Sequence, residues 1–370
     1  MRSQVMVIGG YGHVGQQICL QLSKVYPGQI VAAGRSYEKA EQFSQQTKGR
    51  VRPYKLDVSQ PLHSDWMDET KLVIMCLDQE DTSFAEIVLQ SGIDYIDISA
   101  KGAYMEQMAQ LDQQHISATA LLSVGLAPGL TNLLAAKAVS MLSSVDQIDI
   151  GIMLGLGDQH GKAAIEWTID HVHTDYELTE HAQRKRVKSF TGGRQVNFGG
   201  QLGKRYAYRF PFSDQQTLPS TLHVPSVTTR LCFDSRLATG ALAFTRSLGL
   251  TSFLTLPKMK DRAISMIQSS QVGTDQYAVK VEAAGTDGKK VHHAALGIKG
   301  HDESQATAQV ACAAALHLLS RLFQPGIFHI EELFSLTFEN GHFALMDQKT
   351  KKEQALAVRA SLLTAGIKED

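Results

Sequence analysis

The sequence has few cysteines and no excess of charge, and each absence excludes a class of protein. Its four cysteines, Cys19, Cys76, Cys232 and Cys312, lie far apart and form no C-x-x-C pair. Neither a disulfide framework nor a zinc site built on paired ligands is therefore expected. The chain has 36 Lys and Arg residues against 37 Asp and Glu, a formal net charge of -1. Binding to nucleic acid needs an excess of positive charge that displaces counterions from phosphates, so we expect no nucleic-acid partner.

Long apolar runs are also missing. No stretch approaches the roughly 18 apolar residues that span a bilayer, and the N-terminus lacks the basic and then apolar build of a signal peptide. We therefore expect a cytoplasmic protein with no membrane partner. The one basic run, Arg184-Lys185-Arg186, is short, and we interpret it as a solvated face. The length of 370 residues suits about two domains, each with its own core.

The first third of the chain alternates strand-like and helix-like segments. Short, strongly apolar runs occur at residues 4–9, 29–34, 51–57, 72–77, 95–98 and 120–124. Helical patterns lie between most of them, and Ser36 is placed to cap the second helix. This order predicts parallel strands joined by right-handed crossovers, hence an α/β fold with a Rossmann-type doubly wound sheet. We assign this domain to residues 1–128.

The pattern changes after residue 128. Strand-like runs come closer to strict alternation and are separated by long irregular connections, including a loop-like region at residues 211–225. These features predict a second, α+β domain with a mixed sheet over residues 129–300. The charged residues 351–370 predict an exposed C-terminal tail helix.

A glycine motif carries the chemistry of the first domain. The residues Gly10-Tyr11-Gly12-His13-Val14-Gly15 fit G-x-G-x-x-G directly between the first strand and the first helix. Gly10 allows the tight turn, Gly12 lets a pyrophosphate approach the backbone, and Gly15 lets the helix pack closely on the strand. The phosphates then meet the unpaired N–H groups at the positive end of the helix dipole. All six residues are predicted to bind a nicotinamide dinucleotide.

The end of the second strand chooses between the two nicotinamide cofactors. Enzymes that use NAD usually place a carboxylate there for the ribose 2′-hydroxyl, but this strand ends Ala33-Gly34-Arg35-Ser36. Arg35 and Ser36 suit a 2′-phosphate, so we expect NADP(H). The alternative is that Arg35 stacks on the adenine without selectivity. Asp57 and Leu77, which end the third and fourth strands, complete the predicted cofactor site.

Several segments carry a family resemblance. They are Ile8-Gly9 with the glycine motif, Ala33-Gly34-Arg35-Ser36 with Lys39-Ala40, Leu56-Asp57-Val58, Gly92-Ile93-Asp94-Tyr95-Ile96-Asp97-Ile98-Ser99, Gly125-Leu126-Ala127-Pro128-Gly129-Leu130-Thr131-Asn132, and Pro325-Gly326-Ile327 with Glu331. Together they resemble the saccharopine dehydrogenase-like reductases, well over residues 1–135, faintly over 136–300 and modestly over 301–335.

The resemblance implies a substrate domain in the second half and a segment, residues 301–350, that returns to the Rossmann domain. Members of this family make or break secondary amines and imines of amino acids. Saccharopine reductases have Asp in the third position of G-L-D-P-G, where this chain has Ala127. The resemblance therefore does not extend to saccharopine itself, and the substrate stays open.

Candidate catalytic residues follow the fourth and fifth strands, whose carboxyl ends should face the nicotinamide. Lys101 offers a cation for a substrate carboxylate, and Ser99 or Asp97 offers a hydrogen bond. The alternative is that Asp97 braces a strand end and that Lys101 is a solvated loop lysine.

In the second domain, a polar glycine-flanked loop contains His160 and Lys162. His160 is the candidate acid, because histidine titrates near neutrality. We expect Lys162 and Asn132 to contact a substrate held between the domains. His171 and His173 point to different faces of one helix, so no metal is expected.

The leading hypothesis is an NADP(H)-dependent oxidoreductase, a homodimer, that acts on a CH–NH bond of an amino-acid-derived small molecule. One alternative is a reductase of C=C or C=O bonds, which predicts an apolar tunnel in the second domain. Another is a dinucleotide-sensing module without chemistry, which predicts no substrate-sized pocket. One fold hosts many functions, so the fold alone does not choose among them.

Overall fold

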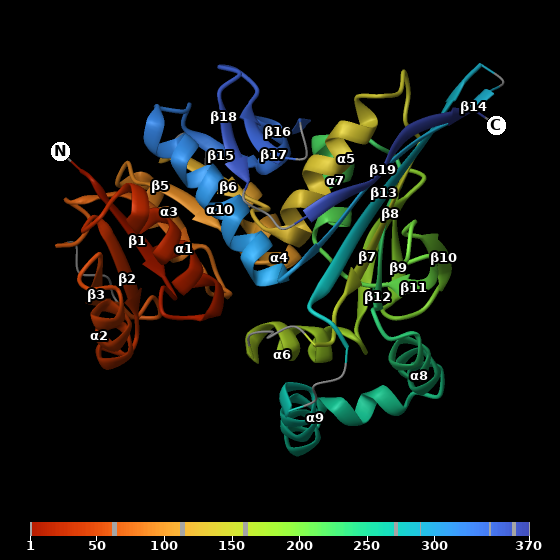
Figure 1. Ribbon diagram of the computed structural model, residues 1–370, viewed down its shortest axis with the longest axis horizontal. Helices are drawn as coiled ribbons and strands as arrows, with labels where there is room; N and C mark the ends of the chain where they lie inside the picture. Colours follow the sequence, from red (N-terminus) through yellow and green to blue (C-terminus); the bar gives the residue numbers. More distant parts are fainter. Residues whose placement is uncertain are drawn as a thin grey trace. The chain divides into compact units, whose positions relative to one another are not determined.

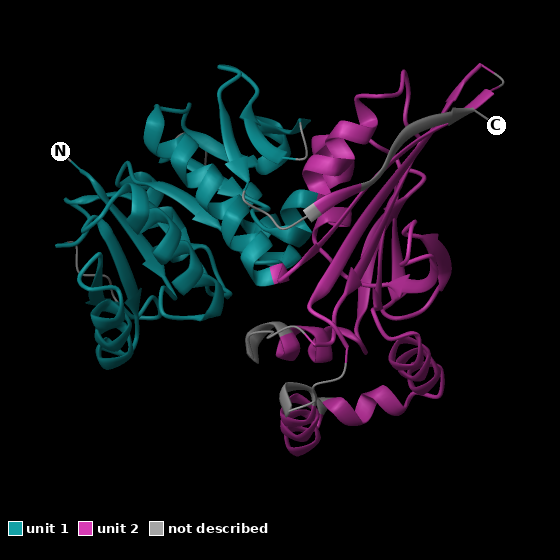
Figure 2. Ribbon diagram, viewed as in Figure 1, with its two compact units in different colours: residues 1–130, 304–357 teal, residues 131–303, 358–370 magenta. Residues whose placement is uncertain are grey.

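The computed structural model describes residues 2–60, 65–111, 115–157, 162–269, 273–288, 290–339, 342–356 and 360–369. The chain forms two compact units, which Figure 2 shows in two colours. The first contains residues 1–130 and 304–357, and the second contains residues 131–303 and 358–370. Within the described ranges, no helix is both long and apolar enough to cross a membrane.

The first unit is built on a seven-stranded sheet whose paired strands are all parallel (Figure 1). Its order is β15-β6-β5-β4-β1-β2-β3. These strands are β1 Gln4–Ile8, β2 Ile30–Gly34, β3 Val51–Lys55, β4 Thr70–Met75, β5 Asp94–Asp97, β6 Thr119–Leu122 and β15 Gly326–His329. Every residue of β1 and β2 is buried, as in a sheet covered on both faces. The order of β1 to β6 is that of a Rossmann fold, and it confirms the predicted α/β class.

The helices of this unit have, in two cases, an end that a local sequence signal explains. They are α1 His13–Val25, α2 Tyr37–Gln46, α3 Ser83–Gln90, α4 Gly102–Ala109, α10 Glu303–Ser320 and α11 Ile330–Leu333. The hydroxyl of Ser36 caps α2 by accepting a hydrogen bond from the Lys39 N–H at 3.3 Å. The first helix ends just before Pro27, which lacks the N–H needed to continue it.

The segment after residue 303 packs on the Rossmann sheet. The Cys312 thiol of α10 lies 3.8 Å from the carbonyl oxygen of Ile18 on α1, and the Lys71 ammonium donates to the Leu319 carbonyl at 2.8 Å. Strand β15 then pairs with β6 and extends the sheet. A small antiparallel sheet follows, formed by β16 Phe334–Glu339, β17 His342–Asp347 and β18 Glu353–Leu356.

The second unit has a mixed seven-stranded sheet of order β10-β11-β12-β7-β13-β14-β19. Strands β12 and β7 are parallel, whereas the other neighbours are antiparallel. The strands are β7 Gln147–Leu154, β10 Arg194–Asn197, β11 Lys204–Arg209, β12 Val227–Phe233, β13 Gln276–Asp287, β14 Lys290–His301 and β19 Ala360–Glu369. The predicted mixed sheet is confirmed. The sheet is curled. The curl brings the edge strand β10 back over β7, so that a Cβ on Gly151 of β7 would lie 2.7 Å from the side chain of Val196 on β10.

The helices of this unit are α5 Thr131–Val139, α6 Lys162–His171, α7 Asp214–Thr221, α8 Arg236–Ser247, the 3-10 helix η3 Leu250–Thr255 and α9 Pro257–Ser269. A hairpin of β8 Asp175–Glu180 and β9 Gln183–Lys188 contains the basic run. Its side chains are exposed, and Arg184 and Arg186 each lie 3.6 Å from a carboxylate of β8. The predicted solvated face is confirmed.

Two predictions about secondary structure are wrong. Residues 351–370 do not form a tail helix, because they contain β18 and β19, and β19 pairs along β14. A strand is favoured there because it satisfies the backbone groups of an edge that would otherwise lie open, and a short window of sequence does not show that edge. The loop-like region 211–225 contains α7.

Candidate functional site

The glycine motif lies at the point where the strand order of the first sheet reverses, between β1 and its neighbours β2 and β4. A Cβ on Gly10 would lie 2.7 Å from the Cα of Ala32, and one on Gly15 would overlap the carbonyl oxygen of Gly9. These two glycines therefore permit close backbone approach, as the motif predicts. A Cβ on Gly12 would meet one atom within the described part of the chain, the Gly9 oxygen at 3.0 Å. Of the three motif glycines, Gly12 is thus the one whose α-carbon faces open space.

The start of α1 is suited to an anionic ligand. Gly12 occupies the N-cap position, and no side chain of the described residues caps the helix there. The first N–H groups of a 13-residue helix are therefore left to a ligand or to water. His13 is exposed and Val14 half-buried at this first turn. A dinucleotide pyrophosphate fits this cradle, because it needs both the bare Gly12 and the uncapped helix.

Tyr11 connects the glycine motif to the end of β2. A Cβ on Gly34 would lie 2.5 Å from the Tyr11 hydroxyl, so the ring lies directly on that glycine. The Ser36 N–H donates to the same hydroxyl at 3.1 Å. The sequence indicates Tyr11 as a cofactor residue but not this contact, which depends on the distance between two loops.

The groups after β2 and β3 form a mixed charge cluster. Arg35 is exposed. Asp57 accepts hydrogen bonds from the N–H and hydroxyl of Ser59, which lower the pKa of its carboxyl, and the nearby charges of Arg35 and Lys55 lower it further. The structure thus brings Arg35 and Asp57, both predicted cofactor residues, close enough to interact electrostatically. The Ser36 hydroxyl, however, donates to the Glu38 carboxylate at 2.8 Å, so a phosphate that uses this hydroxyl must displace Glu38.

Leu77 follows β4 and reaches the glycine motif. A Cβ on Gly9 would lie 2.9 Å from its side chain, and Gly9 has φ +76°, a value that favours glycine. Leu77 is 39% exposed, so one side of it is free to contact a ligand. The structure therefore places Leu77 beside the residues that the motif assigns to the cofactor.

Asp97, at the end of β5, is fully buried in a hydrogen-bonded cluster. It accepts from the Tyr95 hydroxyl at 2.9 Å and from the Ser99 N–H at 2.7 Å, and the Tyr104 hydroxyl lies 3.2 Å from that of Tyr95. Burial raises the pKa of Asp97 to about 6, although the hydrogen bonds from Ser99 and Tyr95 oppose the rise. The carboxyl therefore braces the loop that begins at Ser99 and titrates close to neutrality.

Lys101 joins the loops that follow β4 and β5. Its ammonium donates to the Glu80 carboxylate at 2.8 Å and lies 3.4 Å from the carbonyl oxygen of Gln79. The Lys101 side chain is 31% exposed and that of Glu80 is 87% exposed. An exposed ion pair of this kind is weak, so the ammonium can exchange Glu80 for another carboxylate.

One histidine at the same sheet edge was missed by the sequence reasoning. His329 ends β15, and its Nδ1 lies 2.8 Å from the hydroxyl of Ser123, which follows β6. Burial lowers the pKa of His329 and favours the neutral ring. Without a prediction of β15, nothing in the sequence indicates that this histidine reaches the edge.

The remaining predicted residues belong to the second unit or lie outside the described ranges. Asn132 is fully buried near the start of α5. Lys162 begins α6, and His160 lies outside the described residues. Among the described residues, no group of three or more His, Cys, Asp or Glu side chains is arranged to hold a metal ion.

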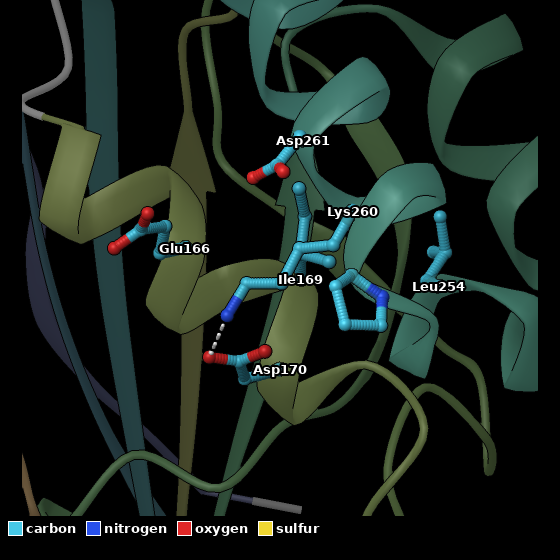
Figure 3. A pocket seen from close by; sticks show the side chains of 7 residues that line it. Glu166, Ile169, Asp170, Leu254, Lys260 and Asp261 are labelled. Atoms are coloured by element: carbon cyan, nitrogen blue, oxygen red, sulfur yellow. Dashed lines mark hydrogen bonds and ion pairs between the residues drawn. The ribbon is translucent and has the colours of Figure 1, made fainter.

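The second unit contains a polar cavity of about 420 Å³ (Figure 3). Its lining comes from α6, η3 and α9, namely Glu166, Ile169, Asp170, Leu254, Pro257, Lys260 and Asp261. The Lys260 ammonium and the Asp170 carboxylate lie 2.7 Å apart, the pair marked by the dashed line in Figure 3. The lining thus contains three carboxylates and one ammonium, so it favours a polar or cationic ligand.

Comparisons with known proteins agree with this geometry. Residues 5–121 match the family model of the saccharopine dehydrogenase NADP binding domain. No curated protein matches the chain. Among solved structures, it is similar to apo saccharopine dehydrogenase (L-Glu forming) from Saccharomyces cerevisiae, with 12% identity, a TM-score of 0.55, and coverage of 88% of this chain and 94% of that one. It is also similar to homospermidine synthase from Legionella pneumophila in complex with NAD, with 12% identity, a TM-score of 0.61, and coverage of 90% and 87%. At this identity the structural likeness shows the fold.

Proposed function

Because the dinucleotide-binding domain of this chain belongs to the saccharopine dehydrogenase-like family of NAD(P)-dependent oxidoreductases, we propose that the protein is an NADP(H)-dependent enzyme acting on a CH–NH bond of an amino-acid-derived substrate. One observation carries this proposal. The glycine motif occurs together with a second strand, β2, that ends at Gly34 without a carboxylate and is followed by the exposed cation Arg35.

The residues of this site fit the parts of a nicotinamide dinucleotide. Gly12 and the uncapped start of α1 hold the pyrophosphate. Leu77 packs on Gly9, directly before the glycine motif, and Tyr11 of the motif packs on Gly34 at the end of β2. When bound, the nicotinamide supplies hydride transfer, and the protein supplies binding, orientation and charge.

The preference for NADP(H) rests on Arg35. Its guanidinium is exposed and close enough to Asp57 to lower that carboxyl's pKa. A 2′-phosphate dianion placed here gains a planar, charge-assisted contact that a ribose hydroxyl does not. Lys55, which also acts on Asp57, adds a second positive charge to the same end of the site.

The catalytic roles follow from the loops after β4 and β5. Lys101 exchanges Glu80 for a substrate carboxylate, while Asp97 holds the loop in place through Ser99. Asp97 is fully buried, so its role is to position the loop. His160 is proposed as the proton donor to the substrate nitrogen, with Lys162 as a substrate contact. Asn132, expected from the sequence to contact the substrate as well, is fully buried, so its proposed role, like that of Asp97, is to position its neighbours.

The cavity of the second unit weighs against the alternative of an apolar substrate, because its lining is polar. A reductase of lipid C=C or C=O bonds needs an apolar tunnel, whereas this cavity exposes four charged side chains. A volume of about 420 Å³ is within the range of small-molecule sites. This cavity also favours an enzyme over a sensor without a substrate pocket.

The test is oxidation of NADPH by the full chain with a panel of amino acids, each mixed with an α-keto acid or an aldehyde. We expect turnover with at least one pair that forms an imine, and none with the amino acid or the carbonyl compound alone. Turnover with an α,β-unsaturated or simple carbonyl compound in the absence of any amine would refute the CH–NH assignment. The homodimer expected from the sequence forms part of the same proposal.

A further inference from the structure

Helix α8 has its polar side turned inward and its apolar side turned to solvent. The side chains that it buries are Thr239 and Arg246. Thr239 accepts a hydrogen bond from the Phe233 N–H at 2.9 Å, and Arg246 donates to the Ser189 carbonyl at 3.0 Å. Leu237 and Phe244, by contrast, are 86% and 64% exposed. A surface helix of a monomer normally has the opposite arrangement.

The exposed apolar side of α8 forms a single stripe. Leu237, Phe244 and Leu248 are spaced by seven and four residues and so lie on one side of the helix. Gly240 and Ala241, which fall between them on the same side, are also exposed. The stripe is therefore apolar along the whole helix.

The two helices that follow continue the same property. Leu250, Phe253 and Leu256 are spaced by three along η3 and are each about half exposed, so they share one edge of a 3-10 helix. On α9, Met259 and Met266 are exposed, whereas Ile264 packs on α6. Figure 1 shows α8 and α9 at one end of the second unit's sheet. We call these eight exposed side chains of α8, η3 and α9 the α8–α9 face.

This concentration is far from an even scatter. Eight of the seventeen exposed large apolar side chains in the described part of the chain lie in the thirty residues from 237 to 266. Each is 41% to 86% exposed. Aromatic side chains have a surface of roughly 150–250 Å², and Leu and Met lie near the lower end of that range. Summed over the three helices, the face therefore exposes on the order of 800 Å² of apolar side chain, whereas the largest patch on a typical monomer is about 300–600 Å².

We infer that the α8–α9 face is the interface of a homodimer in which a second copy of this chain covers it around a twofold axis. Its area matches the roughly 800 Å² that each partner buries in a standard interface, and a two-fold contact uses the same patch on both copies. The exposed charged residues nearby are three cations, Arg236, Lys258 and Arg262, and one anion, Asp261. An anionic membrane is matched by a cluster of about four to eight basic residues, which is more than this face carries. This inference does not depend on the reaction proposed above.

The test compares two equally exposed leucines. Leu237 on the face is 86% exposed, and Leu322 in the first unit is 85% exposed, so Leu237→Asp and Leu322→Asp alter the surface to the same extent at different places. Sedimentation velocity of the full chain at micromolar concentration should show a dimer for the wild type and for Leu322→Asp. Leu237→Asp and Phe244→Asp should weaken dimerisation by about a hundredfold or more, because each change occurs twice across the axis. NADPH binding and the far-ultraviolet circular dichroism spectrum should be unchanged in all three variants, whereas the unfolding temperature should fall only in the two face variants, because they lose the partner subunit.

Three results would overturn the inference. A wild-type monomer at these concentrations would mean that no second copy covers the face. A dimer that persists in both face variants would place the interface elsewhere. Binding of the wild type to phosphatidylserine vesicles, lost in Phe244→Asp while the protein stays monomeric, would assign the face to a membrane surface.

Discussion

The buried carboxyl of Asp97 should make the stability of the protein depend on pH in a direction opposite to that of a salt-bridged aspartate. Burial raises its pKa to about 6, whereas an aspartate in an unfolded chain titrates near pH 3.9. A difference of about two pKa units corresponds to about 3 kcal/mol. Because the folded-state pKa is the higher one, this contribution to stability is complete below about pH 4 and is lost as the pH rises through 6.

Asp97→Asn removes the titrating group while retaining its contacts. The amide oxygen can still accept from the Ser99 N–H, and the amide N–H can donate to the Tyr95 hydroxyl. The neutral side chain carries no desolvation penalty for a charge. The variant should therefore gain stability relative to the wild type by about 1 kcal/mol between pH 5 and pH 7, since roughly half of the total change falls in that window.

Urea denaturation of the protein without cofactor, at pH 5, 6 and 7, measures this difference. Asp57→Asn serves as the control, because Asp57 is only half-buried and hydrogen bonds from Ser59 lower its pKa, so its ionisation is complete before pH 5. A stability difference between Asp97→Asn and the wild type that is constant from pH 5 to pH 7 would refute the reasoning, since Asp97 would then titrate as an ordinary aspartate.

Three further predictions concern the proposed site. The wild type should prefer NADPH over NADH by about tenfold, or about 1.4 kcal/mol. Arg35→Ala should remove most of this preference, whereas Arg52→Ala, which alters another exposed arginine, should not. Equal affinity of the wild type for both cofactors, measured by calorimetry, would contradict this prediction. Gly12→Val should abolish dinucleotide binding without unfolding the protein, and normal NADPH binding in this variant would place the cofactor elsewhere. Lys101→Ala should lower kcat/KM by about tenfold or more while NADPH affinity stays unchanged. The control Glu80→Gln, which frees the Lys101 ammonium from its partner, should not lower kcat/KM. Wild-type turnover in Lys101→Ala would show that Lys101 does not belong to the site.

The first unit was predicted well because its signals are local. A strand, a glycine-rich turn and a helix within the first 25 residues are each stabilised by groups close in sequence. The identity of each glycine follows from steric contacts that any Rossmann turn requires. The Ser36 cap likewise acts on a backbone N–H three residues away.

Other features depended on partners distant in sequence. β15 is four residues long and exists because β6, some 200 residues earlier, offers an edge. β19 was predicted as a helix because its charged neighbours resemble a solvated tail, whereas the open edge of β14 decides the outcome. Pairing of strands satisfies backbone groups that carry no sequence signature.

The site divides in the same way. The sequence alone determined the glycine motif, the cation at Arg35 and the class of cofactor, because these depend on residue type and on spacing within one turn. Only the tertiary structure decided that Asp97 is fully buried beneath Tyr95 and Tyr104, that Glu80 pairs with Lys101, and that α8 presents its apolar side to solvent. Burial and charge pairing depend on which distant segments pack together, and that packing sets both the pKa of a carboxyl and the free surface of a helix.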